Sequence, residues 1–349
     1  MGLKILHSAD WHLDTPFASF PERQRRFLQR ELEKIPGRIG EIVHGERVDL
    51  VLLSGDLLDG QGTPRSVDLL KHAFRDYGVP VLISPGNHDF CAPGSPWMEE
   101  KWPENVHVFT GELTGVALPA LDCRVYGAGY RSMDCSALLE GFRAEGKERY
   151  CVGILHGDPL VKGSPCCPVS VSQVRESGLD YLALGHIHRA GSFRSGDTLC
   201  AWPGCPMGRG WDETGEKGVY LVTLGDTADV KTVPLGFPQF HDLQADIGVD
   251  AQSTLEALLP GGGSRDFYRI TLTGTGTVDL DALQNHFPDF PNLELRDRTQ
   301  PPVELWQDVA SDTLRGAYFR MLKASQDPRA ALAAELSQRL LLGREVPLP

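Results

Sequence analysis

Our prediction of the fold starts from six residues, Ser54-Gly55-Asp56-Leu57-Leu58-Asp59. The stretch before them, 48–53, is apolar except for Asp49 and partly β-branched, which is typical of a buried strand. That strand ends in Ser-Gly, and the carboxylate of Asp56 follows at once. Because open α/β sheets bind ligands at the carboxyl ends of their strands, this run predicts an α/β fold with a functional carboxylate.

Four other apolar stretches also end in side chains that commonly bind metals. Together with Asp56 they give a candidate metal-binding set of seven residues: Asp10, His12, Asp56, Asn87, His156, His186 and His188. One histidine near a strand end is more often structural than a ligand. Seven ligand-type side chains at five strand ends favour a metal site instead.

The size of this set predicts two metal ions. Seven side chains are too many for one first-row ion, whereas one carboxylate can bridge two ions through its two oxygens. Two ions about 3.5–4 Å apart can clamp a phosphoryl group and activate water. The set offers oxygen and nitrogen but no thiolate, which suits Mn²⁺, Fe²⁺ or Zn²⁺ at a catalytic site.

Composition and charge limit the classes of partner. The chain has 349 residues, of which 41% are hydrophobic and 23% charged, enough for a well-buried core and for two domains. The net charge is -13, and an acidic protein does not attract nucleic acid by its overall charge. A phosphate-bearing substrate therefore needs a local positive site, which bound metals can provide.

Cysteine usage and hydropathy predict a cytoplasmic protein that does not enter a membrane. The eight cysteines form no C-x-x-C pair, which favours free thiols in a reducing compartment. Cys166-Cys167 in a Gly/Pro-rich loop leaves a redox role open. The apolar runs are too short to span a bilayer, and no cleavable signal sequence is visible.

Alternating strand and helix patterns predict the domain organisation. Residues 1–235 read as two sheets packed face to face and flanked by helices, with helices expected at 21–43, 64–77 and 134–143. The first of these is expected to break near residues 36–37. Residues 236–300 predict a small α+β module, and residues 301–349 predict two helices at 302–323 and 328–342 that pack on their own module or dock on a partner.

Two further segments have both a structural and a functional interpretation. The run 23–38 holds the densest cluster of basic residues, interleaved with glutamates, and reads as a solvated face with i,i+4 ion pairs or as a phosphate-contacting face. The loop 90–102 contains Trp97 and Trp102, which either pack on the protein or stack on bases. Packing is the commoner role of such aromatic residues.

The motifs resemble those of a known family. In order along the chain they are Asp10-x-His12, Gly55-Asp56-x-x-Asp59, Gly86-Asn87-His88-Asp89, His156 and Gly185-His186-x-His188. This series is similar to the five motifs of the calcineurin-like metallophosphoesterases. The opening run 7–17 and the later stretches 202–206 and 216–222 resemble the DNA repair nuclease branch with its SbcD-type subunits, and especially the YhaO-like group.

The resemblance implies a fold and a role for each candidate ligand. The fold would be a four-layer α/β/β/α sandwich with a small C-terminal α+β capping domain. One metal would be held by Asp10, His12, Asp56 and His188. The other would be held by Asp56, Asn87, His156 and His186, with Asp56 as the bridge. Two divalent ions are implied, with Mn²⁺ preferred over Fe²⁺ or Zn²⁺.

The resemblance also implies a catalytic pair. His88 would point at the scissile phosphate and protonate the leaving oxygen or stabilise its charge. Asp59 would orient His88 and raise its pKa, although Asp59 before Gly60 is equally typical of a turn. Asp89 would either support the ligands from behind or be a turn residue, and the turn is the commoner role.

Two positions depart from the pattern of the nuclease relatives. Cys205 stands where they often carry Ser, which could alter a phosphate contact. Asp14 stands where many SbcD-type nucleases have Gly, which points to the YhaO-like group.

Three functions stay open at this point. The first is a two-metal phosphodiesterase that hydrolyses DNA, as a repair exonuclease or endonuclease. The second is a phosphoesterase on small phosphodiesters or nucleotides, because the same metal site serves both reactions. The third is a weakly active subunit that docks on an SbcC-like coiled-coil ATPase, or on a second copy of the chain.

Overall fold

The computed structural model describes residues 2–248 and 250–343 of the chain. The chain divides into two compact units, Met1–His241 and Asp242–Pro349, and each is described by itself. The domain boundaries that we placed after residues 235 and 300 stay predictions.

The first unit contains two six-stranded sheets, and the N-terminal strand lies inside the first of them. Its strands lie in the order β12-β11-β1-β2-β3-β4. The strands β1 to β4 run parallel, while β11 and β12 extend the sheet with antiparallel pairings. The bounds are β1 Leu3–Ser8, β2 Leu50–Leu53, β3 Val81–Ile83, β4 Val106–Val108, β11 Gly218–Leu224 and β12 Ala228–Pro234.

The second sheet has the order β5-β6-β7-β8-β10-β9. Its four central strands run parallel, and antiparallel strands close both edges. The bounds are β5 Thr114–Leu118, β6 Cys123–Gly127, β7 Tyr150–His156, β8 Tyr181–Gly185, β9 Gly191–Ser195 and β10 Thr198–Trp202.

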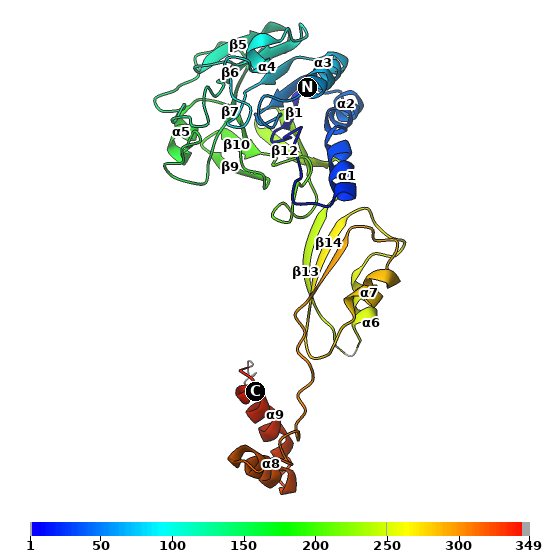
Figure 1. The fold of residues 1–349 in the computed structure, drawn as a ribbon. Helices are drawn as coiled ribbons and strands as arrows, with labels where there is room; N and C mark the ends of the chain where they lie inside the picture. Colours follow the sequence, from blue (N-terminus) through cyan, green and yellow to red (C-terminus); the bar gives the residue numbers. More distant parts are fainter. Residues whose placement is uncertain (1, 249, 344–349) are drawn as a thin grey trace. The chain divides into compact units, whose positions relative to one another are not determined.

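The main hydrophobic core lies between the two sheets, where Ile5 and Leu52 of the first sheet join Val152 and Tyr181 of the second in one buried cluster. Helices α1, α2 and α3 lie together on one side of this unit, and α5 lies on the opposite side (Figure 1). Val174 of α5 packs with buried residues from the outer face of the second sheet. The unit is thus the predicted α/β/β/α sandwich, although its fourth layer consists of one short helix and loops.

The helical layer beside the first sheet differs from the prediction at one break. The expected helix at 21–43 is two helices, α1 Glu22–Leu32 and α2 Ile35–Glu46. Pro36 does not break α2 but lies in its first turn, where a missing backbone N–H costs nothing. Helix α3, Pro64–Tyr77, has the predicted bounds, and Thr63 caps it by accepting a hydrogen bond from the backbone N–H of Ser66. The unit also contains two short α-helices, α4 Pro96–Glu99 and α5 Val171–Glu176, and the short 3-10 helix Pro119–Leu121.

The helix predicted at 134–143 is wrong. This segment forms turns, and Gly141 adopts a left-handed conformation with φ of 69°. Cys135 instead forms a β-bridge with Cys166, and its backbone N–H donates to the carbonyl of Pro165 at 2.7 Å. A ten-residue stretch with a glycine has little intrinsic helical stability, so these tertiary hydrogen bonds decide its conformation.

The second unit begins with an α+β module around a three-stranded sheet of order β13-β14-β15. Its core includes Leu255 from α6, Leu283 from α7 and Ile270 from β14. Both helices begin with aspartate caps, Asp250 and Asp279, whose side chains accept backbone hydrogen bonds. The bounds are β13 Phe240–Asp246, α6 Ala251–Leu258, β14 Phe267–Thr273, α7 Leu280–His286 and β15 Leu293–Asp297.

The last two helices are α8 Leu314–Ala324 and α9 Ala330–Leu341, and they contact each other through Tyr318 and Ser337, whose hydroxyls lie 2.8 Å apart. The predicted helix at 302–323 begins too early, because Thr313 caps α8 and the preceding residues form turns. No helix within residues 2–248 and 250–343 is long and apolar enough to cross a membrane. The predicted cytoplasmic location stays a prediction.

Candidate metal centre

All seven candidate ligands lie at one edge of the two sheets. Asp10 and His12 follow β1, Asp56 follows β2, and Asn87 follows β3. From the second sheet, β7 ends at His156, and His186 and His188 follow β8. These five strands run parallel within their sheets, so their carboxyl ends deliver the side chains to a common edge.

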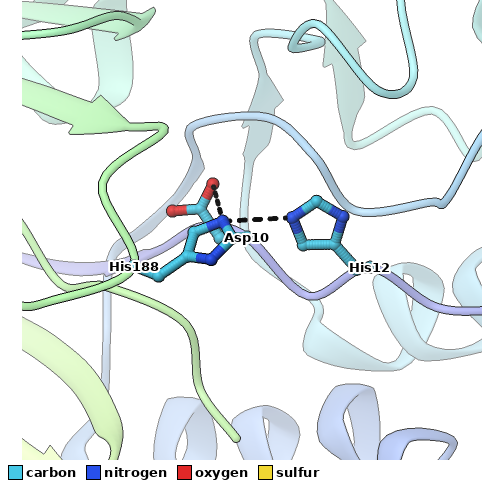
Figure 2. Close-up of side chains that lie close together, drawn as sticks. All are labelled: Asp10, His12 and His188. Carbon is cyan, nitrogen blue, oxygen red and sulfur yellow. Dashed lines mark hydrogen bonds and ion pairs between the residues drawn. The ribbon is translucent and has the colours of Figure 1, made fainter. Parts of the chain in front are cut away.

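Three of the side chains form a first cluster, shown in Figure 2. The Nε2 atoms of His12 and His188 lie 3.3 Å apart, and His188 Nε2 lies 3.9 Å from Oδ1 of Asp10. In Figure 2 the carboxylate of Asp10 and the ring of His12 both face the same nitrogen of His188. This is a compact group of one oxygen and two nitrogen donors.

A second cluster surrounds Asn87. Its side-chain oxygen, Oδ1, lies 3.0 Å from His156 Nε2 and 3.3 Å from His186 Nδ1. The other ring nitrogen of His156, Nδ1, contacts the carbonyl of Ser54 at 2.8 Å. Since a carbonyl only accepts, Nδ1 carries a proton, and Nε2 is the ring nitrogen that faces the cluster.

Asp56 lies between the two clusters. Its Oδ2 atom is 3.7 Å from His12 Nε2 in the first cluster and 3.3 Å from His156 Nε2 in the second. Its Oδ1 atom accepts a hydrogen bond from the backbone N–H of His88 at 2.9 Å. The carboxylate thus has the position that a bridging ligand requires.

Four of the candidate ligands have strained backbones. Asp10, His12, Asp56 and His186 have φ angles of 56°, 46°, 52° and 90°, in the left-handed region that side chains with a Cβ disfavour. Such strain costs about 1–3 kcal/mol per residue and persists only where the surrounding structure enforces it. The occurrence of four strained residues in one site indicates a functional site whose backbone conformation lowers local stability.

The chemistry of the cluster fits divalent cations. Oδ2 of Asp10 is buried and has no hydrogen-bond partner among the described residues. Burial, together with the charge of Arg209, lowers the pKa of His12 to about 3, so its imidazole is a neutral ligand at pH 7. Burial opposes a charge on His156, but Asp56 outweighs it and raises the pKa of His156 to about 9. The carboxylates of Asp56 and Asp10 thus favour a positive charge at His156. Metal ions would supply that charge in place of the extra proton on the imidazole.

Comparison with known families decides the assignment of the chain. Residues 3–190 match the family described as calcineurin-like phosphoesterase. The chain belongs to this family. It is a family of hydrolases that depend on a dinuclear metal centre.

Three relatives illustrate the similarity in sequence. The uncharacterized metallophosphoesterase YhaO of Bacillus subtilis is 31% identical over 328 residues, which cover 81% of this chain and 77% of YhaO. The SbcD component of the SbcCD nuclease from the same organism is 24% identical, covering 63% of this chain and 66% of the relative. The DNA double-strand break repair protein Mre11 of Aeropyrum pernix is 25% identical, covering 70% and 64%.

Solved structures that are similar to this chain include a dimetal phosphatase from Danio rerio. It has a TM-score of 0.47 and 14% identity, and the alignment covers 67% of this chain and 96% of that one. A purple acid phosphatase from yellow lupin has a TM-score of 0.41 and 13% identity, with coverages of 64% and 49%.

In this phosphoesterase chain, His88 and Asp59 stand beside the seven candidate ligands. Nδ1 of His88 lies 3.3 Å from Oδ1 of Asp59, and the His88 side chain is 45% exposed. The hydrogen bond to Asp59 raises the pKa of His88 above its ordinary value, although partial burial opposes this shift. The same bond lowers the pKa of Asp59. Asp59 thus contacts the ring of His88, in addition to its position in the turn before Gly60.

Asp89 has a larger role than the turn position that its sequence suggests. Its buried carboxylate accepts hydrogen bonds from the backbone N–H groups of Gly86 at 2.7 Å and Leu57 at 2.9 Å. It also accepts a hydrogen bond from the N–H of Asp56 at 3.2 Å. One side chain thus connects the loops after β2 and β3, and no strand-end pattern distinguishes it from an ordinary turn aspartate.

Sequence reasoning also missed Glu213, which lies in the loop between β10 and β11. Oε1 of Glu213 is 2.6 Å from Nδ1 of His188 and 2.8 Å from Nη2 of Arg209. Burial opposes ionisation of Glu213, but hydrogen bonds from His188 and Arg209 outweigh it and hold the pKa well below its ordinary value. Only the fold brings this loop to His188, so no local pattern marks Glu213 as part of the site.

The two departures from the nuclease pattern have structural roles. Cys205 is fully buried, and its thiol lies 3.6 Å from Oε2 of Glu213, so a direct contact with a substrate phosphate is excluded. Asp14 accepts hydrogen bonds from the backbone and side chain of Thr63, both at 3.0 Å, and another from Ser66 at 2.5 Å. Asp14 thus holds the start of α3.

The remaining aromatic and basic segments pack as ordinary surface or core. Trp97 is 3% exposed and stacks on Trp102 with ring centroids 5.0 Å apart, which confirms packing rather than base stacking for these two rings. In the basic run, Arg26 pairs with Glu22, and other basic residues of the run pair with nearby glutamates. These pairs support the interpretation as a solvated, ion-paired face.

Proposed function

We propose that the chain is a two-metal phosphodiesterase that hydrolyses the phosphodiester bonds of DNA. The observation that carries this proposal is the position of Asp56, whose Oδ2 atom lies close to an imidazole nitrogen of each ligand cluster. A bridging carboxylate between two sets of neutral and anionic donors is the arrangement that two-metal hydrolysis requires.

The chain's residues would divide between two ions. Asp10, His12 and His188 would hold one, Asn87, His156 and His186 would hold the other, and Asp56 would bridge them. When bound, the two ions supply neutralisation of phosphate charge and activation of water. The donor set suits Mn²⁺ first, with Fe²⁺ and Zn²⁺ as alternatives.

His88 would supply the proton to the leaving oxygen. Its backbone N–H donates to Asp56 at 2.9 Å, and its side chain is 45% exposed, so a substrate could reach the ring. Asp59 contacts Nδ1 of that ring at 3.3 Å, which leaves Nε2 as the atom that delivers the proton. An acid in this position typically contributes about 10²- to 10⁴-fold to the rate.

DNA as substrate rests on the similarity to relatives whose names describe a nuclease component and a double-strand break repair protein. The acidic net charge of -13 favours a second candidate substrate, small phosphodiesters or nucleotides. The ion pairs along the basic run support that alternative, because paired arginines contribute less attraction for a phosphate backbone.

A partner is the third candidate element of the function. Helix α8 exposes Leu314, Tyr318 and Met321, which are 89%, 38% and 68% exposed. Their spacing of four and three residues places them on one face of the helix. We propose that this face docks on an SbcC-like coiled-coil ATPase, and the alternative is a homodimer of the chain.

The deciding experiment compares substrates at saturating Mn²⁺. Purified wild type is tested on end-labelled single-stranded DNA, a DNA hairpin, a cyclic nucleotide and a nitrophenyl phosphodiester. Asp56→Ala and His88→Ala are measured beside it, with His72→Ala as the matched control, since His72 is an exposed histidine on α3.

DNA cleavage by wild type and by His72→Ala, lost in the other two variants, supports the nuclease. Turnover of the small diesters alone keeps the metal site and excludes DNA as substrate. A fully metallated wild type that cleaves nothing contradicts the enzyme and leaves the partner-dependent role to be tested with its ATPase.

A further inference from the structure

We propose that Glu213 is a positioning residue that orients His188 for metal binding and fixes its tautomer. The inference rests on the two-metal function proposed above and concerns one of the two ions, the one held by Asp10, His12 and His188. Glu213 is not itself a ligand, because its carboxylate contacts the ring nitrogen of His188 that faces away from the cluster.

The two nitrogens of His188 have different surroundings. Nδ1 lies 2.6 Å from Oε1 of Glu213, a short distance typical of a hydrogen bond to an ionised group. Nε2 faces the cluster, 3.3 Å from Nε2 of His12. A carboxylate can only accept, so the proton resides on Nδ1 and the lone pair of Nε2 is directed at the metal position.

The carboxylate of Glu213 is fixed on both of its oxygens. Oε2 accepts the backbone N–H of Arg209 at 2.8 Å and contacts the thiol of Cys205 at 3.6 Å. Oε1 accepts Nη2 of Arg209 at 2.8 Å in addition to the imidazole of His188. A buried carboxylate that is paired with a guanidinium stays charged, so it remains an acceptor for His188.

Arg209 lies close to His188 because both side chains donate to the same oxygen of Glu213. Nη2 of Arg209 lies 3.0 Å from Nδ1 of His188, and both atoms lie within 2.8 Å of the same oxygen of Glu213. If Arg209 instead donated to Nδ1, the proton of His188 would sit on Nε2 and block the lone pair. The shorter contact to an anionic acceptor favours the tautomer with Nδ1 protonated.

The two ligand clusters differ in what orients their histidines. In the second cluster, Nδ1 of His156 donates to the backbone carbonyl of Ser54, which no side-chain substitution removes. His188 depends on a side chain from the loop between β10 and β11. Loss of Glu213 should therefore weaken one ion of the pair and leave the other, whereas a general loss of folding would weaken both.

The size of the effect follows from other metal sites. Removing the group that hydrogen-bonds a metal-binding histidine typically costs about 10- to 100-fold in metal affinity. Glu213→Gln keeps the shape but removes the charge, and its amide can present a donor to Nδ1. Glu213→Asp keeps the charge on a shorter side chain and should recover part of the affinity.

The test is titration of the metal-free chain with Mn²⁺. Calorimetry measures the affinity for each ion, and electron paramagnetic resonance detects the spin-coupled ion pair. Glu148→Gln is the matched control, because Glu148 also accepts two hydrogen bonds from an arginine, Arg124, at 2.8 and 3.0 Å, away from the cluster. Thermal melting of each metal-free variant checks its folding.

We expect wild type and Glu148→Gln to bind two ions. Glu213→Gln should bind one ion normally and the second about 10- to 100-fold more weakly, with loss of the coupled signal at limiting Mn²⁺. Unchanged binding of both ions by Glu213→Gln, or equal weakening of both, would overturn the role of Glu213. A folded wild type that binds no ion pair would contradict the two-metal function itself, which separates the two failures.

Discussion

The carboxylate of Asp89 accepts the backbone N–H of Leu57 at 2.9 Å and so connects the loop after β3 to the loop after β2. The same side chain accepts N–H groups of Gly86 and Asp56. The two loops carry Asn87 and the bridging Asp56, so the geometry of the candidate metal centre depends on a residue that would not touch a metal.

Replacement of Asp89 by Ala should therefore destabilise the protein and lower its affinity for metal. The variant leaves several buried N–H groups without an acceptor, and each unsatisfied group costs about 1–3 kcal/mol. Urea unfolding of metal-free protein gives the stability change, and Asp68→Ala on the exposed side of α3 is the control. A free energy of unfolding equal to that of wild type would show that water replaces the carboxylate.

The contrast between Asp56 and Asp89 shows how far sequence reasoning reaches. Asp56 could be predicted because a parallel sheet collects the ends of its strands at one edge, and the same holds for the six other candidate ligands. Asp89 has the same chemistry one residue after His88, but its partners are backbone N–H groups that only the folded loops bring close. Glu213 could not be found for a similar reason, since it reaches His188 from a loop distant in sequence.

The elements that sequence reasoning misplaced have the same origin. The segment 134–143 has an apolar pattern typical of a helix, but the β-bridge of Cys135 with Cys166 determines its path. Helix α8 begins at Leu314 where Thr313 provides a cap, a local signal that the longer apolar pattern obscured. The hydrophobic periodicity and the helix or strand propensity of the residues thus identify secondary-structure elements well where no tertiary hydrogen bond competes.

The pair of His88 and Asp59 predicts a change in the pH dependence of turnover. Asp59 raises the pKa of His88, so removing its charge in Asp59→Asn should lower that pKa. His88 must be protonated to act as an acid, and activity is lost as pH rises through its pKa. The basic limb of the kcat profile should therefore move to lower pH in Asp59→Asn than in wild type, at equal Mn²⁺ saturation.

His88→Ala should lack that limb altogether and lose about 10²- to 10⁴-fold in kcat while it keeps its metals. Metal analysis of the purified variant separates this outcome from a loss of ligands. An identical profile for Asp59→Asn and wild type would assign Asp59 to the turn before Gly60 and not to the proton transfer.

Gly86 predicts a steric test of the site. A Cβ at this position would lie 2.2 Å from Oδ1 of Asp56 and 2.8 Å from Nδ1 of His156. Gly86→Ala should therefore displace the bridging carboxylate and lower both metal affinity and turnover. Gly37→Ala in α2 is the matched control, because a Cβ there meets nothing within 4 Å and should stabilise the helix by about 0.5–1 kcal/mol.

Mn²⁺ titration and thermal melting of both glycine variants check this prediction. The expected pattern is weaker metal binding in Gly86→Ala alone, with the melting temperature of Gly37→Ala equal to or above that of wild type. Normal metal binding by Gly86→Ala would mean that the loop after β3 shifts enough to accommodate the methyl group.

Removal of metal predicts a reversible loss of stability. Buried carboxylates and imidazoles of the seven-residue set would be left without a cation, and strained residues such as Asp10 and Asp56 would lose the interactions that compensate their backbone conformation. A ligand at 100 times its Kd stabilises a protein by about 2.7 kcal/mol. Chelator should lower the melting temperature, and Mn²⁺ should restore it in wild type but not in Asp56→Ala.

The exposed face of α8 gives the prediction that tests assembly. Leu314 and Met321 are largely in contact with solvent, so replacing them with Ser removes little buried surface, and helix α8 should keep its stability in the free chain. If this face docks on a coiled-coil ATPase or on a second copy, Leu314→Ser with Met321→Ser should abolish the complex.

The measurement is light scattering of the chain alone and with the ATPase purified from the same cell. The control is Leu160→Ser, which replaces another exposed leucine that belongs to the first unit. A complex that survives the double substitution would place the docking surface elsewhere, whereas a monomer under both conditions would exclude docking through α8.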